Sequence, residues 1–153
     1  MSSMSGTRRP IQGIEIGMAA LIALDCLAVN AFAASELPQL SRESLGPFAV
    51  AYHDKQTSLA FVPVLLLLLF LVRGLSVVGR TAVLVFVGAA IANITSPLIW
   101  DAGVPDYIVF RDIDVIANLS DVLMISASVV IAASIGFDLV ERARQGRGPS
   151  PRP

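Results

Sequence analysis

Apolar residues gather along this chain in four long stretches that are separated by polar segments. The stretches cover about residues 14–34, 58–78, 81–100 and 117–140. Crossing the hydrocarbon core of a bilayer takes about 20 helical residues. The first, third and fourth stretches meet that length. The second is short if it ends at Val72, just before Arg73, and reaches that length only if it continues to Val78. The pattern predicts an all-α membrane protein with four transmembrane helices.

The composition supports a membrane protein of one domain. Of the 153 residues, 55% are hydrophobic and 15% are charged, and the mean hydropathy is +0.74. A formal net charge of −1 argues against nucleic acid as a partner. We expect one domain over residues 1–140, followed by a disordered basic tail over 141–153. The sequence shows no metal-ligand spacing, and we expect neither a metal nor a cofactor.

Basic residues predict the orientation in the membrane. The two segments 35–57 and 101–116 are rich in Asp and Glu. Most arginines lie elsewhere, at the two ends of the chain and between the second and third stretches: Arg8, Arg9, Arg73, Arg80, Arg142, Arg144, Arg147 and Arg152. By the positive-inside rule both termini are then cytoplasmic, and the two acidic segments face outward together.

Three residues of the first half stand out, and one of them, Asp25, has two interpretations. Asp25 lies near the middle of the first apolar stretch, where it is either a protonated structural residue or part of a wet, polar site. Cys26 is the only cysteine, so it forms no internal disulfide, and we expect it to pack between helices. His53 falls in an outer segment, and we expect an ordinary surface residue.

Polar residues also interrupt or open the last two stretches. Asn93 follows a run of small residues that begins at Gly88 and favours close helix approach, so Asn93 serves either helix packing or a site. Pro97 is expected to kink or end that helix. Asn118 and Asp121 have the spacing of a helix cap in which an amide and an acid satisfy the first turn. Alternatively, Asp121 is half of a functional pair.

Taken in order, these positions resemble the motifs of signal peptidase II, the bacterial lipoprotein signal peptidase. The segment from Gly88 to Pro97 resembles the family block G-G-A-x-G-N-x-x-D-R. Val104-Pro-Asp106-Tyr-Ile is similar to V-V-D-F-I, and Ala117-Asn118-Leu-Ser-Asp121 is similar to F-N-x-A-D. The ordered set carries the resemblance, since no single block matches in full.

The first half resembles the family more weakly. The segment from Leu24 to Val29 is similar to the first-helix block D-x-x-[ST]-K, and residues 48–61 are similar to an outer strand that ends in N-x-G-A-A-F. The resemblance therefore covers about residues 14–140. It implies a small strand and loop region on the outer face, at about 35–57.

The family consists of aspartyl proteases of the bacterial cytoplasmic (inner) membrane, which cut prolipoproteins before a diacylglyceryl-modified cysteine. Two aspartates share one proton, so that one acts as base and the other as acid. The resemblance implies a multi-pass protein of that membrane. The implied partners are membrane lipid, a diacylglyceryl-modified prolipoprotein or another membrane protein.

Motif by motif, the resemblance implies a role for each polar residue. Asp121 matches the second catalytic aspartate, and Asn118 matches its supporting asparagine. Asn93, Asp25 and Asp106 match residues that support the site.

Several departures fall on the active site itself. The first catalytic aspartate is Ser96 in this chain, the arginine after it is Pro97, and the first-helix lysine is Val29. A serine holds no charge near neutral pH and cannot share a proton in a carboxyl pair. Asp101, five residues after Ser96, is a candidate replacement if the helix end folds back.

These departures favour a non-proteolytic member of the family that binds lipid or an acylated peptide. Whether it is an enzyme stays open at this point. One alternative is a divergent active protease that uses Asp121 with Asp101 or Asp106. A second is a structural or accessory subunit in which the polar residues only join the helices.

Overall fold

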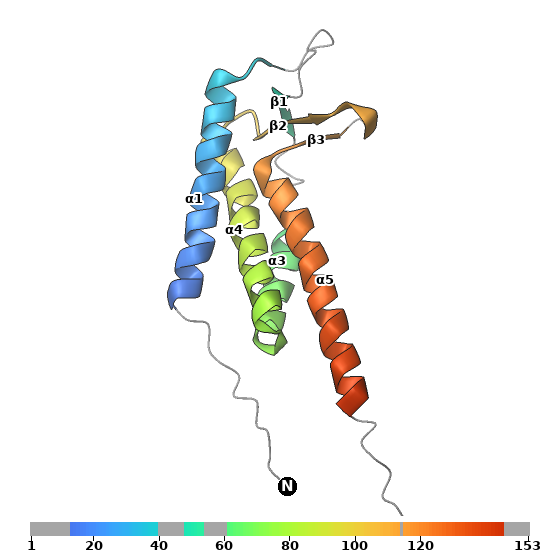
Figure 1. The fold of residues 1–153 in the computed structure, drawn as a ribbon. Coiled ribbons are helices and arrows are strands. Elements are labelled where there is room, and N and C mark those ends of the chain that lie inside the picture. Colours follow the sequence, from blue (N-terminus) through green and yellow to red (C-terminus); the bar gives the residue numbers. More distant parts are fainter. Residues whose placement is uncertain (1–12, 40–47, 54–60, 114, 146–153) are drawn as a thin grey trace, which may run out of the picture.

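The structure, a computed structural model, describes residues 13–39, 48–53, 61–113 and 115–145 (Figure 1). Four α-helices make up most of it. They are α1 (Gly13–Glu36), α3 (Phe61–Leu71), α4 (Val77–Ile99) and α5 (Leu119–Gln145). A short 3-10 helix, η1 (Val72–Gly74), follows α3 directly.

Three of these helices are long and apolar enough to cross a membrane: α1, α4 and α5. The protein is therefore a multi-pass membrane protein, as predicted. The remaining helix, α3, is shorter than the predicted membrane span. At 11 residues, α3 rises roughly 16 Å, about half of a hydrocarbon core of roughly 30 Å. Residues 58–60 of the predicted second span lie outside the described residues.

Three helix ends differ from the expected ones by several residues. The second helix was expected to reach about residue 78, but α3 ends at Leu71. The third apolar stretch was expected to begin near residue 81, but α4 begins at Val77, where Ser76 caps it by accepting a hydrogen bond from the N–H of Gly79 at 3.3 Å. The last helix continues through residues 141–145 to Gln145, so the start of the predicted disordered tail is helical. Residues 146–153 lie outside the described part of the chain.

Helix α4 is the centre of the bundle. It contacts α1, α3 and α5, and in Figure 1 it lies between α1 and α5 with α3 behind it. Its core residues are mostly small, which allows the neighbouring helices to come close. At Gly88 an added Cβ would lie 2.6 Å from the carbonyl oxygen of Ala19 on α1. The close approach predicted from the small residues is therefore present between α1 and α4.

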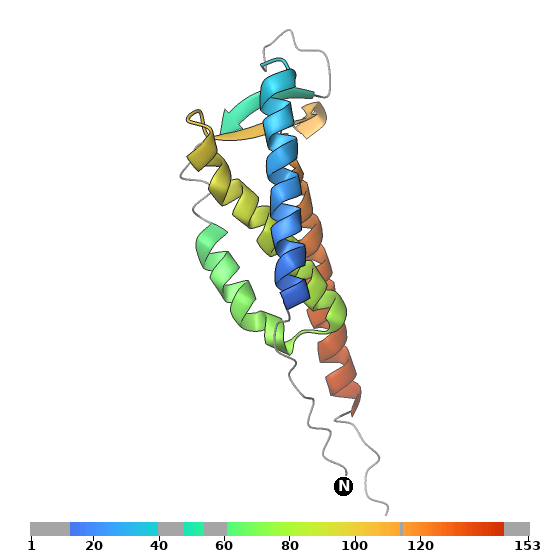
Figure 2. The same ribbon diagram turned by 90° about the vertical axis from the view of Figure 1, so that its left-hand side faces the viewer.

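A three-stranded antiparallel sheet covers one end of the bundle (Figures 1 and 2). It consists of β1 (Phe48–His53), β2 (Val104–Phe110) and β3 (Val115–Ala117), in the order β1-β2-β3. Strand β1 lies in the expected outer strand region. The other two strands fall in the segment 101–116, where no strand was predicted.

The sheet lies where α4 ends and α5 begins, while the start of α1 and the end of α5 lie at the opposite end (Figure 2). The described parts of the two acidic segments, 35–39 with 48–53 and 101–113, thus meet at one end of the molecule, as the charge pattern predicted. The turn into β2 contains Gly103 at φ +117°, where an added Cβ would lie 2.3 Å from the carbonyl oxygen of His53. A side chain there would push β1 away from β2.

Candidate functional site

The candidate site begins at the first turn of α5, where Asn118 and Asp121 cap the helix reciprocally. The N–H of Asp121 donates to Oδ1 of Asn118 at 3.0 Å, and the N–H of Asn118 donates to Oδ2 of Asp121 at 3.1 Å. Free N–H groups at a helix start need such acceptors, and a carboxylate there also suits the helix dipole. The cap predicted from the sequence is therefore present.

The same carboxyl group also joins α5 to α4. Nδ2 of Asn93 donates to Oδ1 of Asp121 at 2.8 Å, and Asn93 is only 1% exposed. Both carboxyl oxygens of Asp121 thus accept a hydrogen bond from an amide. The cap interpretation and the site interpretation of Asp121 are compatible, because the cap holds the carboxyl group that Asn93 also binds.

A second acid, Asp106 of β2, belongs to the same network. Nδ2 of Asn118 donates to Oδ1 of Asp106 at 2.7 Å, while Oδ1 of Asn118 serves the cap. Asn118 is fully buried and Asp106 is 5% exposed. Asn118 therefore links the two acids, since its side-chain amide donates to the Asp106 carboxyl and its backbone N–H donates to the Asp121 carboxyl.

His53 completes the network at the sheet. Its Nδ1 lies 2.5 Å from Oδ2 of Asp106, and Nδ1 is the donor when Asp106 is ionised. The register brings the two together, because Ala51 pairs with Asp106 and His53 pairs with Val104 across β1 and β2. The expectation that His53 is an ordinary surface residue was wrong: its ring is half-buried against an acid.

Tyr107, the neighbour of Asp106 on β2, supports the start of α5 from the sheet. Its Oη accepts a hydrogen bond from the N–H of Leu119 at 3.0 Å. Burial raises the pKa of the Tyr107 phenol above its ordinary value of 10.0, and the acids nearby add to the rise, against the opposing effect of the Leu119 amide. The phenol therefore stays neutral in the folded protein at physiological pH.

Ser96, at the position where the resemblance implies a catalytic aspartate, is bonded to α1 and to its own helix. Ser96 is fully buried. Its hydroxyl donates to the carbonyl oxygen of Ala92 at 2.8 Å and accepts from Nδ2 of Asn30 at 3.2 Å. Ser96 thus helps to join α4 to α1, and neither of these two hydrogen bonds leads to the Asp121 carboxyl.

The two other predicted acids lie outside this network. Asp101 is exposed in the turn after α4, and Asp25 is exposed on α1. In the part of the chain that the structure describes, neither carboxyl group is hydrogen-bonded to Asn93, Asn118 or Asp121. The network consequently unites Asn93, Asp106, Asn118 and Asp121 of the predicted set, and leaves out Ser96, Asp101 and Asp25.

Asp121 lines a groove of about 460 Å³ that opens to one side of the bundle. The groove runs between α4, β3 and α5. Its other lining residues are apolar apart from one serine: Phe86, Val115, Ile116, Ala117, Met124, Ile125, Ser128 and Val129. A largely apolar groove with one fixed carboxyl group suits a ligand that has an apolar chain and a hydrogen-bond donor or positive charge beside it.

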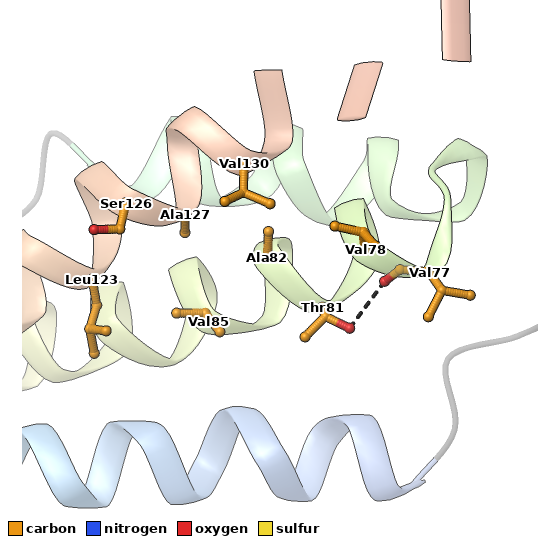
Figure 3. A pocket seen from close by; sticks show the side chains of 9 residues that line it. All are labelled: Val77, Val78, Thr81, Ala82, Val85, Leu123, Ser126, Ala127 and Val130. Carbon is orange, nitrogen blue, oxygen red and sulfur yellow. Dashed lines mark hydrogen bonds between the residues drawn. The ribbon is translucent and has the colours of Figure 1, made fainter. Parts of the chain in front are cut away.

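A second groove, of about 390 Å³, lies lower between α4 and α5 and holds no charged side chain. In Figure 3, Ala82 of α4 and Val130 of α5 point toward one another across it, and the only polar side chains shown are Thr81 and Ser126. The Thr81 hydroxyl is already bonded to the carbonyl oxygen of Val77 at 3.0 Å. This groove suits packing against lipid and offers no chemistry.

Two residues of the region were missed from the sequence. Asn30 is fully buried, and it lies one helical turn after Cys26, which is also fully buried. That spacing in an apolar stretch was a usable signal for a helix contact. His53 had no such signal, because only the β1–β2 pairing brings it to Asp106. Among the described residues, no group of three or more His, Cys, Asp or Glu side chains could hold a metal ion.

No protein-family model matches this chain, and a search of curated proteins returned no match.

Proposed function

We propose that this chain is a signal peptidase II-like protein of the bacterial cytoplasmic membrane that binds lipid or an acylated peptide without cutting it. In this proposal both termini are cytoplasmic, and the sheet lies on the outer face. The ordered motif resemblance and the distribution of arginines support the placement. The groove beside Asp121 supports the binding role.

The observation that carries the proposal is the surroundings of the Asp121 carboxyl group. It lines an apolar groove, and its two oxygens accept hydrogen bonds from the side-chain amide of Asn93 and from the backbone N–H of Asn118, neither of which is an acid. An aspartyl protease needs two carboxyl groups that share a proton. Ser96, at the position of the first aspartate, is bonded to α1 and has no acid to offer.

Asp106 is a poor substitute for the missing acid. Its two oxygens are bonded to Asn118 and His53, and Asn118 lies between it and Asp121. A proton shared directly between the two carboxyl groups would require both hydrogen bonds to rearrange. A general base typically contributes about 10²–10⁴-fold to a rate, so we expect the loss of the dyad to reduce cleavage by at least that factor.

The groove explains how binding could persist without cleavage. An acyl chain fits among the apolar side chains that line it, such as Phe86, Met124 and Ile125. At its polar end, the Asp121 carboxylate can accept a hydrogen bond from a peptide N–H or attract an amine. Because Asn93 and Asn118 fix that carboxylate, the site is organised before the ligand arrives.

The test is the binding of a fluorescent diacylglyceryl-modified peptide to the purified protein in lipid nanodiscs. We expect saturable binding that weakens about tenfold or more in Asp121→Asn, since a charge-assisted hydrogen bond becomes a neutral one. Asp101→Asn is the matched control, because Asp101 is exposed and away from the groove, and it should bind like the wild type. Equal binding by Asp121→Asn and wild type would refute the proposed site.

The same preparations distinguish the divergent protease. We expect no cleavage of a diacylglyceryl prolipoprotein over hours, and no change in Asp106→Asn. Turnover that disappears in both Asp121→Asn and Asp106→Asn would show an active protease that uses the pair linked by Asn118. The variant Ser96→Asp measures whether the scaffold supports the family chemistry once the acid is restored.

A purely structural subunit gives a third pattern. In that case Asp121→Asn would lower the thermal stability of the protein, while neither it nor the wild type would bind lipopeptide. Native mass spectrometry of the purified protein, with detection of bound lipid, separates this outcome from the proposed function.

A further inference from the structure

Asp25, at the middle of α1, is a polar group that the Asp121 network does not include. Helix α1 runs from Gly13 to Glu36, so Asp25 is about as far from either end of the helix as a residue can be. Its side chain is exposed. In the described part of the chain it has neither a hydrogen bond nor an ion pair. A carboxyl group in that position faces the hydrocarbon core instead of the bundle.

The side of α1 that carries Asp25 points away from the rest of the protein. The buried residues of α1 include Ala19, Ala23, Cys26 and Asn30, and these lie on the face that meets α4. At helical spacing, Asp25 lies more than a quarter turn away from that face. The structure therefore does not provide Asp25 with a partner from α4 or α5.

The neighbours of Asp25 on its own face are apolar and exposed. Met18 and Leu21 precede it by seven and four residues and are 41% and 61% exposed; Val29 and Phe32 follow by four and seven and are 37% and 63% exposed. These offsets place the five side chains in one stripe along the helix. The stripe has the form of a helix-packing surface with an acid at its centre.

A second acid of α1, Glu15, is paired with a cation of a neighbouring helix. Glu15 lies near the start of α1, and both of its carboxyl oxygens bind Arg80 of α4, at 2.8 and 2.9 Å. Intramembrane acids are costly, and they are almost always paired or turned inward. Since Arg80 is engaged by Glu15 at the opposite end of the bundle from the sheet, it does not serve Asp25.

We propose that the Asp25 stripe, formed by Met18, Leu21, Asp25, Val29 and Phe32, docks a transmembrane helix of another protein that carries a Lys or Arg at the same depth. The positive charge would neutralise Asp25, and the four apolar side chains would pack on the partner helix. A second copy of this chain is the less suitable occupant, because it would bring a second carboxyl group and no cation. The inference does not depend on what the Asp121 groove binds.

The experiment uses the full chain and a designed partner in neutral phosphatidylcholine vesicles. The probe is a labelled polyleucine transmembrane peptide with one central lysine, compared with the same peptide carrying leucine at that position. Energy transfer from labelled protein to peptide reports association. We expect the lysine peptide to associate at least tenfold more strongly than the leucine peptide.

Substitutions then locate the effect. Asp25→Asn and Asp25→Leu should reduce association of the lysine peptide to the level of the leucine peptide. Asp112→Asn removes an exposed acid outside the membrane helices and should change nothing. Phe32→Ala should weaken association of both peptides, since it removes apolar contact and leaves the charge.

Two results would overturn the inference. One is equal association of the lysine and leucine peptides with the wild-type protein. The other is energy transfer between differently labelled copies of this chain that disappears in Asp25→Asn, which would assign the stripe to self-association. Circular dichroism and size exclusion of each variant confirm that a lost signal comes from a folded protein.

Discussion

At the scale of single residues, three positions determine how neighbouring elements contact one another: Gly88, Asn118 and Ser96. Gly88 permits the approach of α1, because its missing side chain leaves room for the Ala19 carbonyl. Asn118 uses both ends of one amide, one for the helix cap and one for Asp106. Ser96 lies at a position where the resemblance implies a catalytic residue, but its hydroxyl bonds to Asn30 of α1 and to the backbone of α4.

The Gly88 contact predicts a size limit at that position. In Gly88→Leu the new side chain would meet Ala19 and Ile22 of α1, and we expect a loss of roughly 1–3 kcal/mol in stability from overpacking. Gly136→Leu is the control, because an added Cβ there meets nothing within 4 Å. Unfolding of both variants in detergent, followed by circular dichroism, gives the comparison. Similar stability of the two leucine variants would contradict the close approach.

The Tyr107 phenol predicts a loss of stability at high pH. Its raised pKa means that, above about its ordinary value of 10.0, the unfolded chain releases the proton while the folded protein still holds it. The contribution is fully present below that pH and is lost as the pH rises through the folded pKa, because the unfolded state binds fewer protons. Tyr107→Phe should be less stable at neutral pH but should show a shallower decline. Thermal unfolding between pH 8 and 11 measures the two slopes, and parallel slopes would show that Tyr107 does not titrate in this way.

At the scale of elements, the start of α5 is where hydrogen bonds join this helix to α4 and to the sheet. It receives the cap from Asn118 and Asp121, the contact from Asn93 on α4 and the Tyr107 hydroxyl from β2. The sheet thus holds the helix end, and the helix end holds the Asp121 carboxyl group at the groove. The strands matter for the site because they supply Asp106 and His53.

The importance of this junction predicts unequal effects of two cap substitutions. Asn118→Ala removes the acceptor for the Asp121 N–H and the donor to Asp106, and we expect it to cost about 2 kcal/mol or more. Ser76→Ala removes the cap of α4, where the hydroxyl accepts one backbone hydrogen bond at 3.3 Å, and also its 2.7 Å hydrogen bond to the Ser134 hydroxyl of α5. It should still cost less than Asn118→Ala, about 1 kcal/mol. Hydrogen exchange at the first turns of α5 and α4 locates each loss. If Ser76→Ala had the larger effect, the central role of Asn118 would be refuted.

At the scale of the whole molecule, the structure is a three-helix membrane core with a short fourth helix and a sheet at one end. The groove beside Asp121 opens to the side of the bundle below the sheet. In the proposed function, this opening lets a ligand enter from the bilayer while its polar end stays near the sheet. The Asp25 stripe lies on the separate outward side of α1.

The proposed orientation is testable with single cysteines in a Cys26→Ser background. Ile113, which is 67% exposed beside the sheet, should react as Ile113→Cys with a membrane-impermeant maleimide added to intact bacterial spheroplasts. Arg144 lies in the last turn of α5, and Arg144→Cys should react only after the membrane is permeabilised. The reverse pattern would invert the orientation and move the sheet to the cytoplasmic side.

The sequence by itself determined the membrane class, the three long helices and the cap at Asn118 and Asp121. These follow from local chemistry: hydrocarbon requires runs of apolar residues, and a helix start requires acceptors for its free N–H groups. It also indicated that Asn93, Asp106, Asn118 and Asp121 belong together, through the order of motifs along the chain.

Only the tertiary structure decided which of these residues meet. Strands β2 and β3 were not predicted, since their short runs gain stability from pairing with partners far along the chain. His53 reaches Asp106 through that pairing alone. The rotation of α1 about its axis turned Asn30 inward and Asp25 outward, and no local pattern shows which face of an almost uniformly apolar helix will meet its neighbour.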